Sequence, residues 1–172
     1  MLAFFKESLI GQYITVFIVS MVPLIELRGA IPIAHGFNLT GTGFNLILGY
    51  VLIAIGNMIP VPLIYFFARK VLEWGKDKPV IGKFFTFCLE KGEKGGQKLQ
   101  AKAGQGLFVA LMLFVGIPLP GTGAWTGTLA ASILDMDFKK TVTAVICGIA
   151  LAAVIVSVVS ALGFGAYVGI KG

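Results

Sequence analysis

Four long stretches of this sequence contain no charged residue, and this feature limits the chain to one class of fold. They cover residues 8–25, 29–68, 103–134 and 141–170. Each reaches the ~18 apolar residues that indicate a helix able to cross a membrane. Charged residues make up only 13% of the chain, against roughly 25% in soluble domains. We therefore predict an all-α integral membrane protein with several crossings and a single domain.

A basic segment separates the charge-free stretches into two pairs. Residues 69–102 hold nine Lys and Arg against four acidic residues, which accounts for most of the net charge of +6. The positive-inside rule places such a loop in the cytoplasm, where it can also contact anionic membrane lipids. We expect a prokaryotic cytoplasmic membrane and exclude nucleic acid as a partner. The predicted first half, loop and second half are residues 1–68, 69–105 and 106–172.

Inside this loop, apolar residues recur at helical spacing. They are Ile81, Phe84, Phe85, Cys88 and Leu89. The pattern is typical of an amphipathic helix lying on the inner leaflet. A linker packed against the helical bundle is the alternative.

Each half contains a short apolar stretch, a break rich in Pro and Gly, a short apolar piece and a longer span. The first break covers residues 23–32 and the second covers residues 118–127; both open with Pro-Leu, 95 residues apart. The longer spans, 44–68 and 141–168, start 97 residues apart. This matched order indicates a weak internal repeat.

The pieces after the breaks are too short to cross a membrane. Residues 30–39 and 123–134 number 10 and 12, against the ~20 needed. With the basic loop inside, two hairpins that re-enter from opposite faces satisfy the order of the segments. Two such halves form an inverted repeat, which is an architecture of transporters. The rival topology makes residues 9–25 and 107–134 full spans.

Glu26 and Arg28 are the only full charges between Glu7 and Arg69. A charge at the centre of a bilayer costs roughly 2.5–3.5 kcal/mol on insertion scales, so it persists where it pairs, faces a cavity or binds something. We predict that both line a substrate or ion pathway together with Gly29 and Pro32. The alternative places them at the membrane surface as the polar end of residues 9–25.

The second break offers backbone groups for binding. Its prolines and glycines permit sharp turns and close approach of the backbone, and a helix beginning near Thr122 would direct its positive end at an anion. A purely structural hairpin tip is the alternative. Asn57 lies inside the first long span, next to Pro60, and is a candidate cavity-facing hydrogen-bonding group. The predicted pathway residues here are Asn57, Pro118, Pro120, Gly121, Thr122, Gly123 and Trp125.

The sequence does not indicate an enzyme. Cys88, Cys147 and the single histidine, His35, show no spacing typical of a metal site, and no nucleophile–base arrangement stands out. No phosphate-binding motif follows the glycines of the second break. We therefore expect no cofactor, no metal and no catalytic residue, and we expect the N-terminus not to be a cleaved signal.

Two motifs resemble the signature stretches of the putative small multidrug export protein family. They are Glu26-Leu-Arg-Gly-Ala-Ile-Pro32 and Phe114-Val-Gly-Ile-Pro-Leu-Pro-Gly-Thr-Gly-Ala-Trp-Thr-Gly127. This resemblance implies export of small molecules. A more distant resemblance, at Glu26, Pro32 and Phe138, is to the DedA-like superfamily, which implies two re-entrant hairpins and lipid flipping. The chain departs from that superfamily in having no arginine between Phe114 and Lys139.

The sequence therefore predicts a small transporter or exporter, driven by an ion gradient or by the substrate's own gradient. Lipid flipping or scrambling is the first alternative, and a non-transporting membrane scaffold is the second. Because two hairpins and two spans bury little backbone from lipid, we expect a homo-oligomer, most simply a dimer. Gly148, Ala152 and Ala153 are the small residues expected at close helix contacts.

Overall fold

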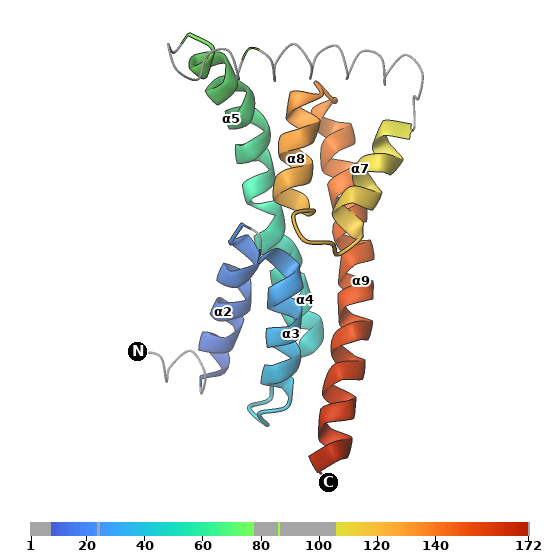
Figure 1. Cartoon of the computed structure of the whole chain (residues 1–172). Helices are drawn as coiled ribbons and strands as arrows, with labels where there is room; N and C mark the ends of the chain where they lie inside the picture. Colours follow the sequence, from blue (N-terminus) through green and yellow to red (C-terminus); the bar gives the residue numbers. More distant parts are fainter. Residues whose placement is uncertain (1–7, 24, 78–85, 87–105, 172) are drawn as a thin grey trace.

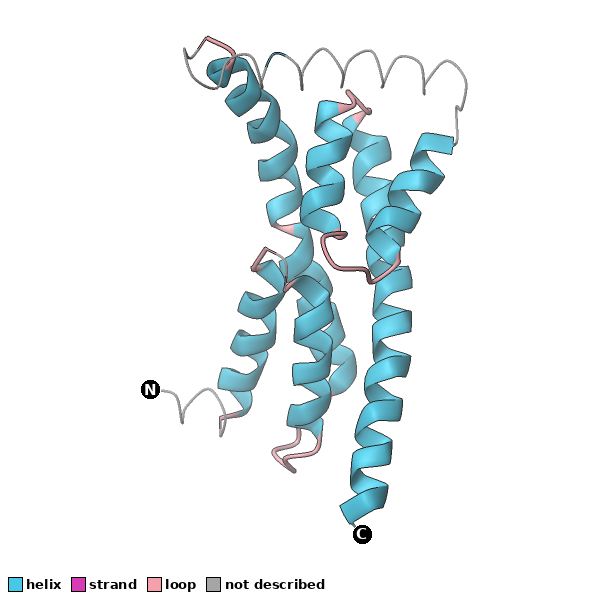
Figure 2. Ribbon diagram, viewed as in Figure 1, coloured by secondary structure: helices cyan, strands magenta, loops and turns pink. Residues whose placement is uncertain are grey.

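The described part of the chain is helical throughout. The computed structural model describes residues 8–23, 25–77, 86 and 106–171. Figure 2 shows helices joined by short loops, and the described residues form no strand, which confirms the predicted all-α class for this part. The helices are α2 (Leu9–Met21), α3 (Glu26–Asn38), α4 (Leu46–Met58), α5 (Pro60–Gly75), α7 (Gly106–Gly116), α8 (Ala124–Ile133) and α9 (Phe138–Lys171).

Two helical stretches are long and apolar enough to cross a membrane. They are Leu46–Phe67, which runs through α4 into α5, and Phe138–Ala166 in α9. Their 22 and 29 residues exceed the ~20 that span a hydrocarbon core of about 30 Å. The outward side of the molecule is apolar as well: Ile47 is 76% exposed and Leu162 is 69% exposed. The protein is therefore a membrane protein.

The other four described helices are short and meet in pairs near the middle of the molecule. With 10 to 13 residues each, they are about 15–20 Å long. Figure 1 shows α2 and α3 on one side of the middle and α7 and α8 on the other, with the connections of both pairs facing each other. The second connection, residues 117–123, interrupts what the rival topology treats as one continuous span.

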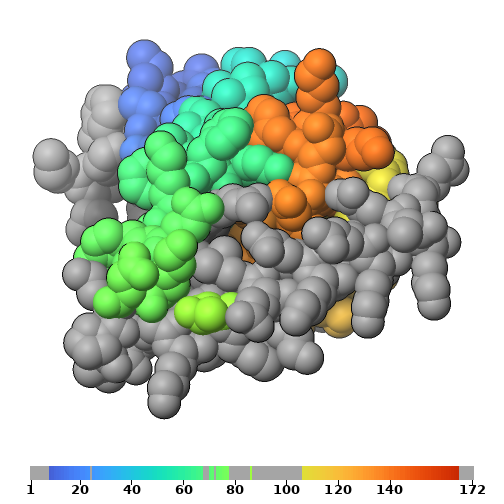
Figure 3. Space-filling view, turned by 90° about the horizontal axis from the view of Figure 1, so that it is seen from above, coloured from blue at the N-terminus to red at the C-terminus, as the bar shows by residue number. Residues whose placement is uncertain are grey.

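Each short pair packs on both halves of the chain. The first helix of each pair lies on the long helix of its own half: α2 packs on α4, and α7 packs on α9. The second helix of each pair lies on the long helix of the other half: α3 packs on α9, and α8 packs on α5. Seen from above, α8 and α5 lie side by side (Figure 3). The two halves are therefore interlocked.

Small residues bring the long helices close to their neighbours within one chain. A Cβ at Gly56 would lie 2.2 Å from the Ser20 hydroxyl, and one at Gly148 would lie 2.7 Å from Val115 Cβ. Ala152 is fully buried. Gly148 and Ala152 thus serve contacts inside the protomer, whereas Ala153 is partly buried, and the homo-oligomer stays a prediction.

The first break is shorter than the sequence predicts. We expected an irregular backbone up to Pro32, but α3 already begins at Glu26 and contains Pro32 in its interior. Proline removes one backbone donor, and its ring crowds the preceding turn, yet α3 continues to Asn38. Arg28 is therefore held on helical backbone, and Glu26 is the first residue of that helix. The predicted amphipathic helix of the loop lies outside the described residues, except for Thr86.

Candidate functional site

The carboxylate of Glu26 contacts the start of α8. Its Oε1 accepts a hydrogen bond from the backbone nitrogen of Trp125 at 3.0 Å, and its Oε2 accepts one from that of Ala124 at 3.2 Å. Glu26 is only 3% exposed. Free amides and the helix dipole make a helix start favourable for a negative charge. The sequence predicted such an anion site near Thr122, and Glu26 of the first half fills it.

Two unusual backbone conformations make this contact possible. Glu26 has a φ of 51°, in the left-handed region, which is uncommon for a residue with a side chain. Gly123 has a φ of 144°, and a Cβ there would lie 2.2 Å from Glu26 Oε2. Only glycine leaves room for the carboxylate at this position, so the glycine of the second break serves the glutamate of the first.

Arg28 binds the connection between α7 and α8. Its guanidinium donates to the carbonyl of Leu119 at 2.6 Å and to the hydroxyl of Thr122 at 2.8 Å. Longer contacts reach the carbonyls of Ile117 at 3.4 Å and Val115 at 3.5 Å. The planar guanidinium has several donors and here takes up carbonyls that the end of α7 leaves without helical partners. The single ammonium group of a lysine could not contact the Leu119 carbonyl and the Thr122 hydroxyl in this way.

Glu26 and Arg28 therefore bind neighbouring segments of the second half from the first turn of one helix. Positions i and i+2 do not face each other on a helix, and each side chain has its own partners in residues 115–125. Both belong to the first turn of α3, and Figure 1 shows that the start of α3 lies where the two helix pairs meet, near the middle of the molecule. Arg28 thus holds the connection between α7 and α8, and Glu26 holds the start of α8.

The remaining predicted residues lie around this contact or along α3. Pro118, Pro120 and Gly121 form the connection that Arg28 binds. The glycine at position 29 lies against Ile25, whose side chain a Cβ would meet at 2.3 Å. Trp125 contributes its backbone nitrogen, while its indole nitrogen is buried without a partner.

Asn57 is the most unusual of the predicted residues. It is completely buried, and neither its amide nitrogen nor its amide oxygen has a hydrogen-bond partner. Thr128, which the sequence analysis did not select, is also completely buried, with an unpartnered hydroxyl. The sequence could have indicated Thr128, because Thr128 and Ser132 are hydroxyl residues four positions apart in an apolar run. The hydroxyl of Ser132 donates to the carbonyl of Tyr65 on α5.

His35 packs against two aromatic side chains. Its ring nitrogen lies 2.7 Å from the hydroxyl of Tyr50, and its ring stacks on Phe164 of α9. The described residues contain no group of three or more His, Cys, Asp and Glu side chains able to hold a metal ion.

One protein family matches this chain over most of its length. The family described as putative small multi-drug export protein matches residues 26–155, a stretch that begins at Glu26 and includes every residue of the contact. The chain belongs to this family. No curated protein and no solved structure was found to be similar to it.

Two open hollows among the described residues lie on opposite sides of the central contact. One lies between α3 and α9, measures about 440 Å³, and is lined by Pro32, Ser160, Gly163 and Phe164. The other lies between α5 and α8, measures about 260 Å³, and is lined by Tyr65, Phe66, Lys70, Glu73 and Ser132. Each hollow therefore follows one of the two interfaces between the halves.

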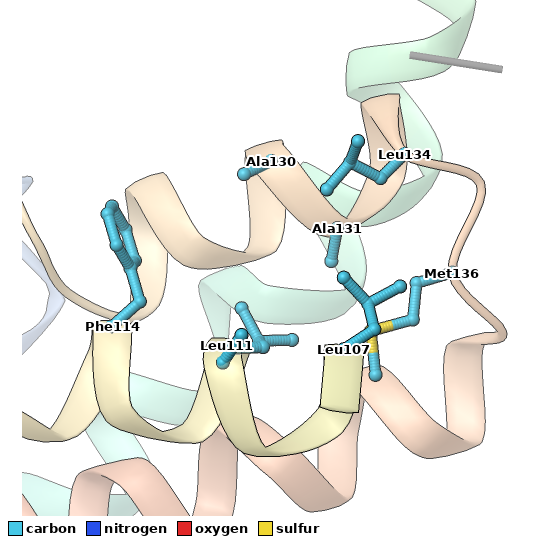
Figure 4. A pocket seen from close by; sticks show the side chains of 8 residues that line it. Leu107, Leu111, Phe114, Ala130, Ala131, Leu134 and Met136 are labelled. Carbon is cyan, nitrogen blue, oxygen red and sulfur yellow. The ribbon is translucent and has the colours of Figure 1, made fainter. Parts of the chain in front are cut away.

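A third cavity separates α7 from α8. It measures about 170 Å³ and its lining is apolar, as Figure 4 shows. The lining residues are Leu107, Ala110, Leu111, Phe114, Ala130, Ala131, Leu134 and Met136. An apolar lining accepts apolar groups, so this hollow suits a hydrocarbon chain.

Proposed function

We propose that this protein exports small molecules across the prokaryotic cytoplasmic membrane as a secondary transporter. Membership of the export family supports this activity. The meeting of two short helix pairs at the centre supports an inverted repeat of two re-entrant hairpins, each followed by a span. Paired broken helices near the bilayer midplane are where such transporters bind their substrates.

In this proposal the basic loop of residues 69–105 lies in the cytoplasm. The pair α2–α3 then opens to the outside and α7–α8 opens to the inside. Each pair would enter to about mid-depth and return, because helices of about 15–20 Å cannot cross a core of about 30 Å. The hollow beside α3 would face outward and the hollow beside α5 would face inward.

The central contact is the observation that carries the proposal. The hydrogen bonds from Ala124 and Trp125 to Glu26, and from Arg28 to residues 115–122, join the two halves at the level between the two hollows. In this proposal, a solute that moves from one hollow to the other has to pass this contact. Transport therefore requires the contact to open, and whatever opens it controls the direction of transport.

A proton on Glu26 would open it. Hydrogen bonds to a charged group contribute about 1.5–3 kcal/mol each, and a neutral carboxyl accepts more weakly from the two amides. A carboxyl proton would also need an acceptor where the start of α8 offers only donors. We therefore propose that a proton gradient drives export by protonating Glu26 from the outside.

Transport in vesicles tests this proposal. We expect purified protein in liposomes with an acid lumen to accumulate ethidium, a fluorescent cationic probe. Glu26→Gln keeps the shape of the side chain but removes its charge, and we expect accumulation to fall at least tenfold. The control is Asp137→Asn, because Asn can still cap α9 through the bond from the Lys140 nitrogen. Glu26→Gln vesicles that match wild type would refute the proton step, and wild-type vesicles that move no solute would refute the transporter.

Lipid flipping is the second candidate, and the apolar cavity between α7 and α8 favours it. A cavity lined by carbon can hold part of an acyl chain. The state of Arg28 argues against it, because its guanidinium already binds four protein oxygens and is not free for a phosphate group. Equal transfer of fluorescent phospholipid with and without this protein in the same vesicles would exclude flipping.

A further inference from the structure

The buried polar atoms without a hydrogen-bond partner gather at one level of the molecule. Among the described residues they are Asn57 Nδ2 and Oδ1, Trp125 Nε1, Thr126 Oγ1 and Thr128 Oγ1. Three of the four residues lie within the first five positions of α8. An unpaired buried polar group loses its hydrogen bonds to water without replacement, and native structures contain few such groups. Their concentration therefore requires a reason.

The packing of α4 on α3 places Asn57 at the level of Glu26. Gly49, Ile53 and Asn57 are four residues apart and share one face of the α4 helix. On that face, a Cβ at Gly49 would lie 3.9 Å from Ala34 Cβ of α3, and the two helices run in opposite directions (Figure 1). Asn57 lies eight residues after Gly49 on α4, and Glu26 lies eight residues before Ala34 on α3. Because eight residues rise about 12 Å along either helix, Asn57 and Glu26 lie at the same level.

The packing of α5 on α8 gives the same level independently. The Ser132 hydroxyl lies 2.7 Å from the Tyr65 carbonyl, and α5 and α8 run in the same direction (Figure 1). Asn57 lies eight residues before Tyr65, and Ala124 lies eight residues before Ser132. Each step is about 12 Å along the helix, so Asn57 and Ala124 lie at the same level. Ala124 is the residue whose nitrogen binds Glu26. Both registers therefore put Asn57 at the level of the central contact, with Thr128 one helical turn further along α8.

We propose that Asn57 and Thr128 form a binding site, beside the central contact, for a small uncharged group that both donates and accepts hydrogen bonds. In the resting protein this group is water, and during export it is a polar group of the solute. The second half of this inference rests on the proposed function, whereas the first half does not.

The chemistry of the site selects a neutral group. Asn57 offers one donating and one accepting atom, and the Thr128 hydroxyl can do either. The negative charge of Glu26 is already balanced by the start of α8 and by Arg28. A further ion would enter without a counter-charge, and burying an uncompensated charge is costly. A water molecule or a hydroxyl, amide or carbonyl group meets no such cost.

Stability measurements separate a binding site from a structural role. Leu has nearly the shape of Asn, and Val has the shape of Thr, so neither replacement leaves a cavity. Because no protein partner is lost, we expect Asn57→Leu and Thr128→Val to unfold at the wild-type temperature or above it. The matched control is Gln12→Met: Gln12 is equally buried but accepts from the Thr42 hydroxyl at 2.8 Å, so this variant should unfold several degrees lower. If the unfolding temperature of Asn57→Leu falls as far as that of Gln12→Met, the proposal is overturned.

Thiol labelling tests for water at the site without any transport. In protein with Cys88 and Cys147 replaced by Ala, Asn57→Cys should react with methyl methanethiosulfonate, because the reactive thiolate forms where water reaches. Ile53→Cys, one turn away on the same face and 2% exposed, should react at least tenfold more slowly. Equal rates at the two positions would overturn the proposal.

Protection experiments identify the class of ligand. Acetamide is a neutral probe with both donor and acceptor atoms, and it should slow the labelling of Asn57→Cys. Acetate and methylammonium at the same concentration should not slow it, and protection by either ion would overturn the neutral class. If Asn57→Cys is labelled and protected while wild-type vesicles export nothing, the site stands and the proposed function fails.

Discussion

Glu26 Oε1 lies 3.0 Å from the backbone nitrogen of Trp125, although 99 positions of the chain separate the two residues. One charged side chain in an apolar protein therefore serves as the N-terminal cap of a helix in the other half. The contact combines two needs: the buried carboxylate needs donors, and the start of α8 needs acceptors. This reciprocal dependence makes its parts separately testable.

The first prediction compares two glycines of the same connection. Gly123 and Gly121 both have positive φ, but a Cβ at Gly123 would strike Glu26, whereas one at Gly121 meets nothing within 4 Å. We expect Gly121→Ala to lose about 1–2 kcal/mol through backbone strain alone. Gly123→Ala should lose at least about 3 kcal/mol, because the strain adds to the lost hydrogen bonds of a buried charge. Thermal unfolding in detergent measures both, and equal losses would show that the Glu26 contact contributes nothing.

The second prediction concerns Arg28. A single ammonium cannot reach the Leu119 carbonyl and the Thr122 hydroxyl as the guanidinium does, so Arg28→Lys keeps the charge and loses contacts. We expect at least about 2 kcal/mol of lost stability and a transport rate reduced at least fivefold. Lys139→Arg, at an exposed position, is the matched control and should change neither. Wild-type stability of Arg28→Lys would show that the charge alone is sufficient.

The third prediction concerns topology. Cysteines placed next to Lys76 and next to Lys139 should be labelled only from the cytoplasm, and a cysteine next to Gly41 only from outside. This pattern follows from the basic loop and from the opposite entry of the two proposed hairpins. Labelling from both sides of intact and of inverted vesicles measures it. If the positions near Lys76 and Lys139 report opposite sides, residues 107–134 cross the membrane and the inverted repeat is wrong.

The fourth prediction concerns assembly. Leu119 is 56% exposed, and its neighbours Pro120 and Gly121 are exposed too, so non-helical backbone lies uncovered near the middle of the molecule. Lipid cannot satisfy such backbone, whereas protein or a wet cavity can. We expect a second copy to cover it, so Leu119→Cys should form a disulfide-linked dimer in native membranes. Ile47→Cys, which is more exposed but lies on a regular helix, should not form such a dimer. Active protein with the mass of a single protomer would contradict the dimer.

The sequence located the apolar elements well, because a membrane protein shows them directly. The charge-free stretch before the loop contains α4 and the first part of α5, the last one contains most of α9, and the second break begins just after α7 ends. The first break was predicted too long because Pro32 was taken as its boundary. Its ring is accommodated inside α3, and no local pattern distinguishes such a proline from one that ends a helix.

The candidate site was predictable in its members but not in its pairing. Charge in an apolar stretch selected Glu26 and Arg28, and turn chemistry selected Thr122 and Gly123. That the first pair would bind the second depends on how two halves pack, and a contact across 99 positions has no periodic signal. Thr128 was missed because a single hydroxyl in an apolar helix is ordinary until its burial and lack of a partner are known.

The long separation of Glu26 from its helix cap also sets an order of events during biosynthesis. At about 5–20 residues per second, the ribosome needs roughly 5–20 s after Glu26 to deliver Trp125. Through that interval the carboxylate has no α8 to cap, and α3 has no α9 to lie against, because both belong to the last third of the chain. The first helix pair can therefore reach its final depth only near the end of synthesis, and a truncated first half should remain accessible to proteases and membrane quality control.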